Sequence, residues 1–247
     1  MMLFKKMHAL SAPALLMFLQ SAFAAHPLVT DDTSTQDVGN RQLEVNTDWY
    51  KKQGDFSHVA DVTFTYGVLS NVDLISDVPS TLSSPRGVND GSLGIKWRFY
   101  EQGPISLAIK PILVLPTGNQ NRSLGTGRSS GALTLIGTVD MSPWMFHGNI
   151  GVNVNRYALA SDRQSNRDAL WRASAAVSYS LTPKCSVVGD IGITRNSDVM
   201  STINPAFMLT GLIYSPNKDV DLDAGIKFGL NSAEVSHQLG VGLTWRF

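Results

Sequence analysis

The sequence predicts an all-β protein, a transmembrane antiparallel up-and-down β-barrel of about 12 strands with short periplasmic turns and longer extracellular loops. Three observations predict it. Apolar and polar residues alternate two apart in segments of about ten residues, which is the period of strands and not of helices. Short and longer connections alternate between these segments. Only 16% of residues are charged, below the roughly 25% of soluble domains.

The first residues have the features of an export signal. Lys5 and Lys6 precede an apolar core, Leu10–Leu19, and Ala22-Phe23-Ala24 supplies a small-x-small cleavage site. The core is shorter than the ~20 residues that a spanning helix needs. We therefore expect residues 1–24 to be removed near Ala24, the alternative being an uncleaved membrane anchor.

The mature chain divides into two parts. Residues 25–40 are polar without a clear period, and we expect a periplasmic or lumenal segment, whereas residues 41–247 show the barrel pattern. Without Lys5 and Lys6 the chain has 18 basic and 20 acidic residues, so no positive excess favours nucleic acid as a partner. Cys185 is the only cysteine, which excludes an intramolecular disulfide.

The alternation is clearest in seven segments. In the last, Leu239, Val241 and Leu243 oppose Gln238 and Gly240. The seven lie near residues 43–49, 60–68, 93–99, 150–154, 171–181, 220–228 and 239–247. Five further segments fit less cleanly, at 72–78, 105–115, 132–141, 185–194 and 205–214. An even total suits a single-chain bacterial barrel.

The connections give an independent indication of the same architecture. Five short turns follow the even-numbered segments, at 70–71, 101–104, 142–144, 182–184 and 215–218. Most connections after odd-numbered segments are longer, at 79–90, 116–130, 157–168 and 197–203, and two are short, at 52–55 and 230–235. This pattern is typical of an outer-membrane barrel whose termini are both periplasmic.

Aromatic residues gather at the predicted ends of the strands, as expected where rings prefer the two membrane interfaces. The periplasmic group is Phe99, Trp144, Tyr179, Tyr214, Trp245 and Phe247, and the outer group is Trp49, Trp171 and Phe228.

Closure of the barrel follows from the membrane, because an unpaired backbone group in hydrocarbon costs several kcal/mol. The first strand must then pair with the last. We expect this pairing to set Glu44 or Asp48 beside Arg246 in the lumen, and hairpin geometry to place Arg246 near Asp219.

Charged residues on the polar faces are the candidates for a functional lumen. Lys96, Arg98 and Lys110 would form a basic wall, and opposed acidic and basic walls orient dipolar solutes and set ion preference. The alternative is a lumen plugged by charges that pair with one another. The full set of lumen-lining candidates is Glu44, Asp48, Asp61, Lys96, Arg98, Lys110, Arg172, Asp219, Asp221, Asp223, Lys227 and Arg246.

No motif predicts a catalytic residue, a cofactor or a metal. The spacing of Asp219, Asp221 and Asp223 resembles the start of a calcium loop, but the twelfth position is Leu230 instead of Glu. Residues 127–131 spell a nucleophile elbow within a loop, without its strand-to-helix context.

The mature histidines also give no metal site. They are His26, His58, His147 and His237, and no two have metal-ligand spacing. We expect His147, beside a predicted periplasmic turn, to be a solvated interface residue.

Short motifs along most of the mature chain resemble a family of outer-membrane transporters labelled the MetA pathway of phenol degradation. The motifs are His26–Thr33, Thr35-Gln36, Gly39, Gln42–Glu44, Tyr66–Val68, Asn71–Leu74, Asp90–Lys96, Leu115–Gly118, Ser215–Asn217 and Asp219–Gly225. Residues 119–130 match nothing in the family. The resemblance implies a barrel, passage of small hydrophobic or aromatic compounds, and no catalytic residues. Phe247 is similar to the terminal aromatic that the outer-membrane assembly machinery recognises in many barrels.

Together these features predict a non-enzymatic barrel in the outer membrane of a Gram-negative bacterium, through which small molecules pass down their gradients. Its expected partners are outer-membrane lipids, the assembly machinery and a small-molecule solute. One alternative is a structural or surface-interaction barrel without an open pore. Another is a membrane-embedded hydrolase, which replacement of Ser129 and His58 would test.

Overall fold

The structure, a computed structural model, describes residues 26–52 and 55–247, and the predicted signal peptide lies outside them. The described strands form one antiparallel sheet of 13 strands. Twelve are long, and one, β4, has only two residues. Their bounds are β1 Arg41–Lys52, β2 Asp55–Leu69, β3 Val72–Thr81, β4 Gly87–Val88, β5 Ser92–Gln102, β6 Ile105–Val114, β7 Ser130–Met141, β8 Trp144–Val154, β9 Ala169–Thr182, β10 Cys185–Thr194, β11 Ala206–Asn217, β12 Val220–Gly229 and β13 His237–Arg246.

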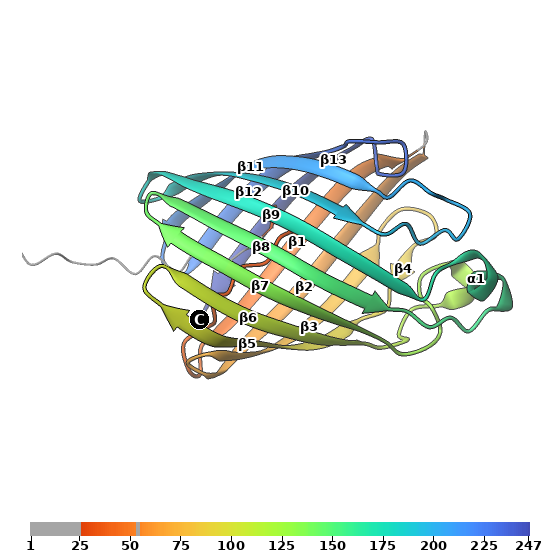
Figure 1. Cartoon of the computed structure of the whole chain (residues 1–247), viewed down its shortest axis with the longest axis horizontal. Helices are drawn as coiled ribbons and strands as arrows, with labels where there is room; N and C mark the ends of the chain where they lie inside the picture. The colour runs from red at the N-terminus through yellow and green to blue at the C-terminus, as the bar shows by residue number, and fades with distance from the viewer. Residues whose placement is uncertain (1–25, 53–54) are drawn as a thin grey trace, which may run out of the picture.

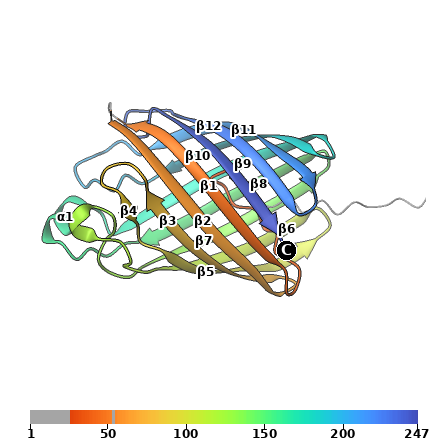
Figure 2. The same cartoon turned by 180° about the vertical axis from the view of Figure 1, so that it is seen from behind.

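The sheet closes on itself. β1 pairs with β13 over ten residue pairs, from Gln42 opposite Arg246 to Lys51 opposite His237. The backbones of Arg41 and Phe247 exchange two further hydrogen bonds, of 2.9 and 3.0 Å. Figure 2 shows the orange β1 beside the dark-blue last strand. Closure gives each long strand two partners, as a bilayer requires, so the predicted twelve-strand barrel is confirmed.

The two ends of the barrel differ as the connection lengths predicted. Tight turns such as Gly103-Pro104 and Pro183-Lys184 join strands at the end that carries the C-terminus. The longer connections at the opposite end carry β4, a 3-10 helix (η1, Gln120–Arg122) and a short helix (α1, Ala160–Ser165). Figure 1 shows α1 and β4 at one end of the tilted strands and the C-terminus at the other. No helix in the described part of the chain is long and apolar enough to span a membrane.

The two faces of the wall have opposite chemistry. Outward residues are large, apolar and exposed, such as Leu93 (49% exposed) and Ile150 (68%), whereas inward Thr134 and Thr244 are at most 1% exposed. Outward rings meet at the short-turn end, where the ring centroids of Trp144 and Tyr179 lie 4.5 Å apart. So much exposed apolar surface is stable only against lipid. The wall therefore has an apolar outer face and a polar inner face, as alternation in a membrane barrel requires.

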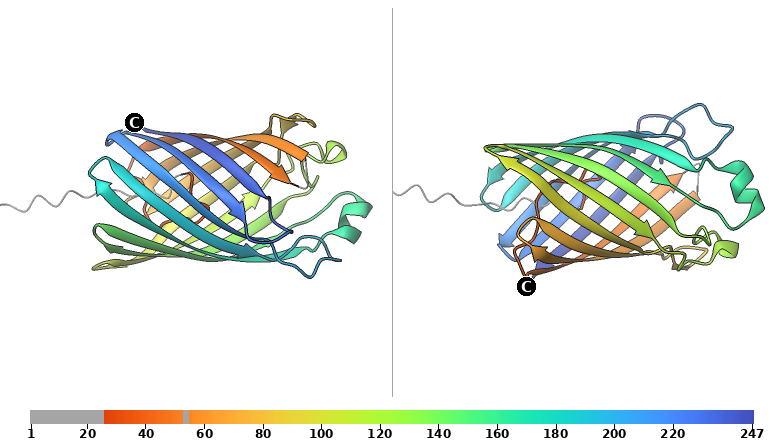
Figure 3. Two further views of the ribbon diagram at one scale, coloured as in Figure 1. Left: turned by 90° about the horizontal axis from the view of Figure 1, so that it is seen from above. Right: turned by 60° about the horizontal axis from the view of Figure 1, so that its bottom comes forward.

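Residues 26–40, which we call the N-terminal segment, precede β1 and lie inside the barrel. Figure 3 shows this stretch enclosed by the strands, and hydrogen bonds tie it to inward side chains of strands from β3 to β12. Thr30, Asp32, Thr33 and Gln36 are each at most 2% exposed. These contacts join the segment to the inner faces of the strands.

Candidate functional site

The N-terminal segment begins against β12 and β1. His26 lies between two carboxylates and bonds Asp223 through Nδ1 and Asp48 through Nε2, the latter at 3.3 Å. Burial disfavours the charged imidazole, but the hydrogen bonds to Asp223 and Asp48 outweigh it and raise the pKa of His26 to about 9. A protonated His26 therefore offsets part of the negative charge of Asp48 and Asp223.

Glycines on the lumen face make room for the next residue, Pro27. A Cβ at Gly211 or Gly225 would come within 2.5 Å of the Pro27 ring, closer than atoms can approach. The glycines of β11 and β12 thus let the chain lie directly on the wall. Contact with Pro27 is thus a physical reason for glycine at the inward positions 211 and 225.

Asp190 on β10 is the main anchor of the segment. Its carboxylate accepts hydrogen bonds from the backbone nitrogens of Val29 and Thr30, both at 2.8 Å, and from Thr30 Oγ1 at 2.7 Å. Thr30 Oγ1 also lies 2.8 Å from Ser174 Oγ on β9. Charge-assisted bonds of this kind are the strong ones, so β9 and β10 hold the middle of the segment firmly.

Two acidic residues of the segment neutralise the predicted basic wall. Asp31 lies 2.5 Å from Lys110 Nζ on β6, and Asp32 lies 3.9 Å from Lys96 Nζ on β5. Burial opposes ionisation of Asp31, but Lys110 and Lys96 hold its pKa below the usual range. Burial raises the pKa of Asp32 above its usual value despite Lys96. Lys96 is further held by the carbonyl of Ser34, which accepts from its Nζ at 2.9 Å.

The segment then returns to the wall near the short-turn end. Thr33 Oγ1 lies 2.5 Å from Ser106 Oγ on β6. The backbone nitrogen of Gln36 donates to the Asp73 carboxylate on β3 at 3.0 Å, and its side-chain amide donates to Gln42 at 2.8 Å. The segment therefore crosses the lumen and joins β1.

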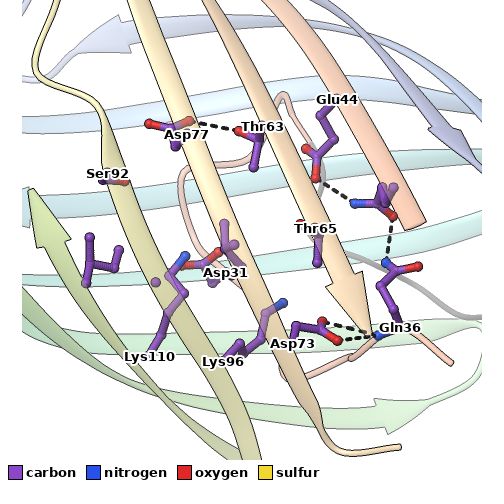
Figure 4. Close-up of a pocket in the computed structure, with 14 residues that line it drawn as sticks. Asp31, Gln36, Glu44, Thr63, Thr65, Asp73, Asp77, Ser92, Lys96 and Lys110 are labelled. Carbon is purple, nitrogen blue, oxygen red and sulfur yellow. Dashed lines mark hydrogen bonds and ion pairs between the residues drawn. The ribbon is translucent and has the colours of Figure 1, made fainter. Parts of the chain in front are cut away.

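A cavity of about 270 Å³ remains between the segment and one side of the wall. Figure 4 shows acidic and basic side chains facing it together, among them Glu44, Asp77, Lys96 and Lys110. Glu44 accepts from the Gln42 amide at 2.6 Å and Asp77 from Thr63 at 2.9 Å. The lining residues are Asp31, Gln36, Gln42, Glu44, Thr63, Thr65, Asp73, Ile75, Asp77, Ser92, Gly94, Lys96, Lys110 and Ile112. Apart from Asp31 and Gln36 they come from β1, β2, β3, β5 and β6, so we call this side the cavity wall.

Most of the predicted lumen residues lie around this arrangement. Glu44, Lys96 and Lys110 face the cavity, and Asp48 and Asp223 hold His26. Elsewhere inside, Arg172 donates to Thr134 Oγ1 at 2.5 Å, Lys227 pairs with Glu234 at 3.5 Å, and Asp61 pairs in register with Asn46. Arg98 pairs with Glu101 at 3.3 Å near the short turn.

One predicted contact of Arg246 is wrong. The register sets it opposite Gln42, whose oxygen accepts from Arg246 Nε at 2.9 Å, instead of beside Glu44 or Asp48. The expected neighbour Asp219 is confirmed, since its carbonyl accepts from the Arg246 nitrogen at 2.7 Å, and the Arg246 guanidinium pairs with Asp221 at 2.5 Å. Asp219 lies in the turn before β12, 3.7 Å from the exposed Lys218. The alternation fixed the faces but not the register between the first and last strands.

The prediction for His147 is also wrong, because it is 5% exposed and bonds Thr138 Oγ1 at 3.0 Å inside the barrel. Asp73, Asp77 and Asp190 were missed as lumen residues. A signal for His147 was present, since it shares the period-two phase of Asn149 on β8, which alternates with the apolar Phe146 and Ile150.

The other motif residues have ordinary surroundings. His58 accepts or donates a hydrogen bond with Thr47 at 2.8 Å and stacks on Trp49 with ring centroids 4.7 Å apart. Ser129 lies in the connection before β7. Within residues 26–52 and 55–247, no group of three or more His, Cys, Asp or Glu residues is arranged to hold a metal ion.

A closed twelve-strand wall with an apolar outer face and a charged lumen defines a β-barrel of the outer-membrane class. The chain belongs to the family described as "Putative MetA-pathway of phenol degradation", whose model matches residues 24–247. A comparison with curated proteins gave no match.

Among solved structures, the fold is similar to an outer membrane channel from Pseudomonas putida F1 (TM-score 0.68, 16% identity, covering 87% of this chain and 98% of that one). It is also similar to the NanC porin (TM-score 0.65, 9% identity, 82% and 98% covered). A third is the toluene transporter TodX of Pseudomonas putida (TM-score 0.51, 10% identity, 92% and 98% covered). At these identities the likeness shows the fold alone.

Proposed function

We propose that this protein is a passive outer-membrane channel, in which small molecules pass the N-terminal segment along the cavity wall. One observation carries the proposal: the segment bonds strands on both sides of the lumen and still leaves about 270 Å³ free beside β1–β6. A twelve-strand barrel is wider than the eight-strand barrels that side chains nearly fill. Side chains that line a pore decide what enters it.

For the solute we propose small aromatic molecules that carry a polar group, such as phenol. Two findings support this class: the family description and the fold shared with a protein named as a toluene transporter. The lining adds a preference. Glu44 and Asp77 accept hydrogen bonds and Lys96 donates them, so a hydroxyl gains partners that a hydrocarbon cannot use.

A second candidate is a sealed barrel that serves only structure or surface interactions. The observation in its favour is the complete burial of Thr30 and Asp32 in the lumen. Charges paired across a lumen can serve stability alone.

Planar-bilayer recording distinguishes the two. We expect the purified full-length mature chain to give discrete conductance steps in KCl, and phenol to reduce the current more than toluene at equal concentration. The absence of steps would favour the sealed barrel. Steps with equal block by both compounds would leave a channel but contradict the proposed solute.

We further propose that the chain is inserted in the outer membrane by the assembly machinery acting on its C-terminus. Phe247 is 48% exposed and packs on Trp245, with ring centroids 4.5 Å apart. It is therefore accessible at the short-turn end. Replacement of Phe247 by Ala should lower the amount of folded barrel in the outer membrane, measured by heat-modifiable migration of the protein.

A further inference from the structure

Three long connections at the outer end form one surface. The connection 82–91 meets 115–129, where Arg122 Nη2 donates to the carbonyl of Arg86 at 3.1 Å. The connection 155–168 meets 115–129, where the nitrogen of Ala158 donates to the carbonyl of Thr126 at 2.8 Å. We call this surface the outer basic surface because of its composition.

The charge of this surface differs from that of the mature chain, which is slightly acidic. Its three connections contain six arginines and three aspartates, with no lysine or glutamate. Five of the six arginines are exposed: Arg86, Arg122, Arg128, Arg156 and Arg163. In the described part of the chain, none of the six forms an ion pair with a carboxylate.

One of the aspartates is already committed to the fold. The carboxylate of Asp90 accepts from the backbone nitrogen of Gly118 at 3.0 Å and from the nitrogen and hydroxyl of Thr126 at 2.7 and 2.9 Å. It holds two of the connections together and does not face the arginines as a counter-charge. The exposed guanidinium groups are therefore available to an external anion.

The distance of two arginines from the strand ends indicates which anion lies near them. Arg128 comes two residues before β7 and Arg156 two residues after β8. Two residues of extended chain span at most about 7 Å, so both arginines lie within about 7 Å of the strand ends. The polar layer on each side of the hydrocarbon is about 5–8 Å thick, so long side chains at these positions come within reach of lipid headgroups.

We propose that the outer basic surface binds the phosphate groups of the lipid A glycolipid that forms the outer leaflet of the bacterial outer membrane. The planar guanidinium group suits phosphate, which it can hold with two parallel hydrogen bonds. The headgroup layer supplies phosphate at this height and around the whole barrel. The proposal rests on the barrel's place in the outer membrane and is independent of whether the lumen conducts.

Arg128 and Arg156 are the residues to change, because no hydrogen bond of their side chains contributes to the fold. Their interactions within the loops are through the backbone: the carbonyl of Arg128 accepts from Thr126, and the nitrogen of Arg156 donates to Ser130 Oγ. The double variant R128Q/R156Q should therefore keep the loops intact. R128K/R156K retains the charge but loses the fork geometry.

A matched control removes two charges from the opposite end of the barrel. Lys184 and Lys218 are both exposed at short turns, and the Lys218 ammonium lies 3.7 Å from Asp219. The variant K184Q/K218Q thus alters the net charge equally without touching the outer basic surface.

The test titrates each purified barrel, in non-ionic detergent, with lipid A that bears both phosphates and with lipid A from which both have been removed. With about 1 kcal/mol per basic residue near an anionic surface, R128Q/R156Q should bind phosphorylated lipid A about 30-fold more weakly than the natural sequence. K184Q/K218Q should bind as the natural sequence does, and R128K/R156K should be intermediate. Dephosphorylated lipid A should bind all four proteins equally weakly.

Equal affinity of R128Q/R156Q and the natural sequence for phosphorylated lipid A would overturn the proposal. So would an equal loss in K184Q/K218Q, which would indicate a general charge effect. Competition by millimolar inorganic phosphate that removes binding completely would show that the surface takes free anions instead of the lipid. Heat-modifiable migration confirms that each variant is folded before titration.

Discussion

The two sides of the lumen treat the N-terminal segment differently. On the side of β9, β10 and β12, Asp190, Ser174 and Asp223 bond the segment directly. The cavity wall also bonds it, through Lys110, Lys96 and Asp73. On this wall, however, Glu44 and Asp77 face the cavity and bond their neighbours on the wall. The cavity wall therefore carries charged residues that face open space beside the segment, and a plug that fills the lumen unevenly in this way narrows a pore without sealing it.

The largest effect should come from removing the segment itself. Deletion of residues 26–39 should raise the single-channel conductance severalfold, because the lumen loses four buried residues and Lys96 and Lys110 lose their partner carboxylates. Planar-bilayer recording measures this, with heat-modifiable migration as the control for folding. An unchanged conductance would mean that the segment does not define the narrowest part.

The attachment of the segment to β10 can be weakened by changing one residue, Asp190. Asp190→Ala removes the acceptor of three hydrogen bonds from Val29 and Thr30. Bonds to a charged group are worth about 1.5–3 kcal/mol each, so we expect the segment to be destabilised by about 3 kcal/mol or more. Limited proteolysis of the segment should become faster.

Asp77→Ala is the matched change on the cavity wall, where the carboxylate accepts a hydrogen bond from Thr63 and none from the segment. It should leave the proteolysis rate of the segment near that of the natural sequence. If both variants sped up proteolysis of the segment equally, Asp190 would not hold the segment more firmly than Asp77 does.

A pH titration should loosen the start of the segment. The folded pKa of His26 is about 9 against an ordinary 6.5, so its contribution is complete below pH 6.5 and is lost as the pH rises through 9. Conductance of the natural chain should rise over this range. The variant His26→Gln should lack this rise, whereas any rise that it shares with the natural chain comes from other groups.

The smallest effect should come from the cavity wall alone. Glu44→Gln keeps the shape of the side chain and its contact with Gln42, so the stability should change by no more than about 1 kcal/mol. Removal of one negative charge from the cavity should reduce the preference for cations, measured as a reversal potential in a KCl gradient. A variant with the natural reversal potential would show that ions do not pass Glu44.

The strands and their faces could be predicted from the sequence because period-two alternation is local. Leu93 and Ile150 each begin one of the seven clearly alternating segments, and both are exposed on the outside. The same local rule would have placed His147 inside with Asn149. The expectation from the adjacent turn was wrong because the alternation of β8 continues through His147.

The arrangement inside the lumen could not be predicted in the same way. His26 and Asp223 are 197 residues apart, and Thr30 and Asp190 are 160 apart. Such pairs depend on strand count, tilt and register, none of which a short segment encodes. Arg246 is an example: the expected register set Glu44 beside it, whereas the observed partner on β1 is Gln42, two residues earlier.

The most direct test fixes the segment in place and asks whether the channel still conducts. The hydroxyl oxygens of Thr33 and Ser106 are 2.5 Å apart, so the variant T33C/S106C, with Cys185 replaced by Ser, offers a disulfide between the segment and β6. The oxidised barrel should conduct as well as the reduced one, because solutes pass beside the segment. A current that vanishes on oxidation and returns with a reductant would contradict a path along the cavity wall.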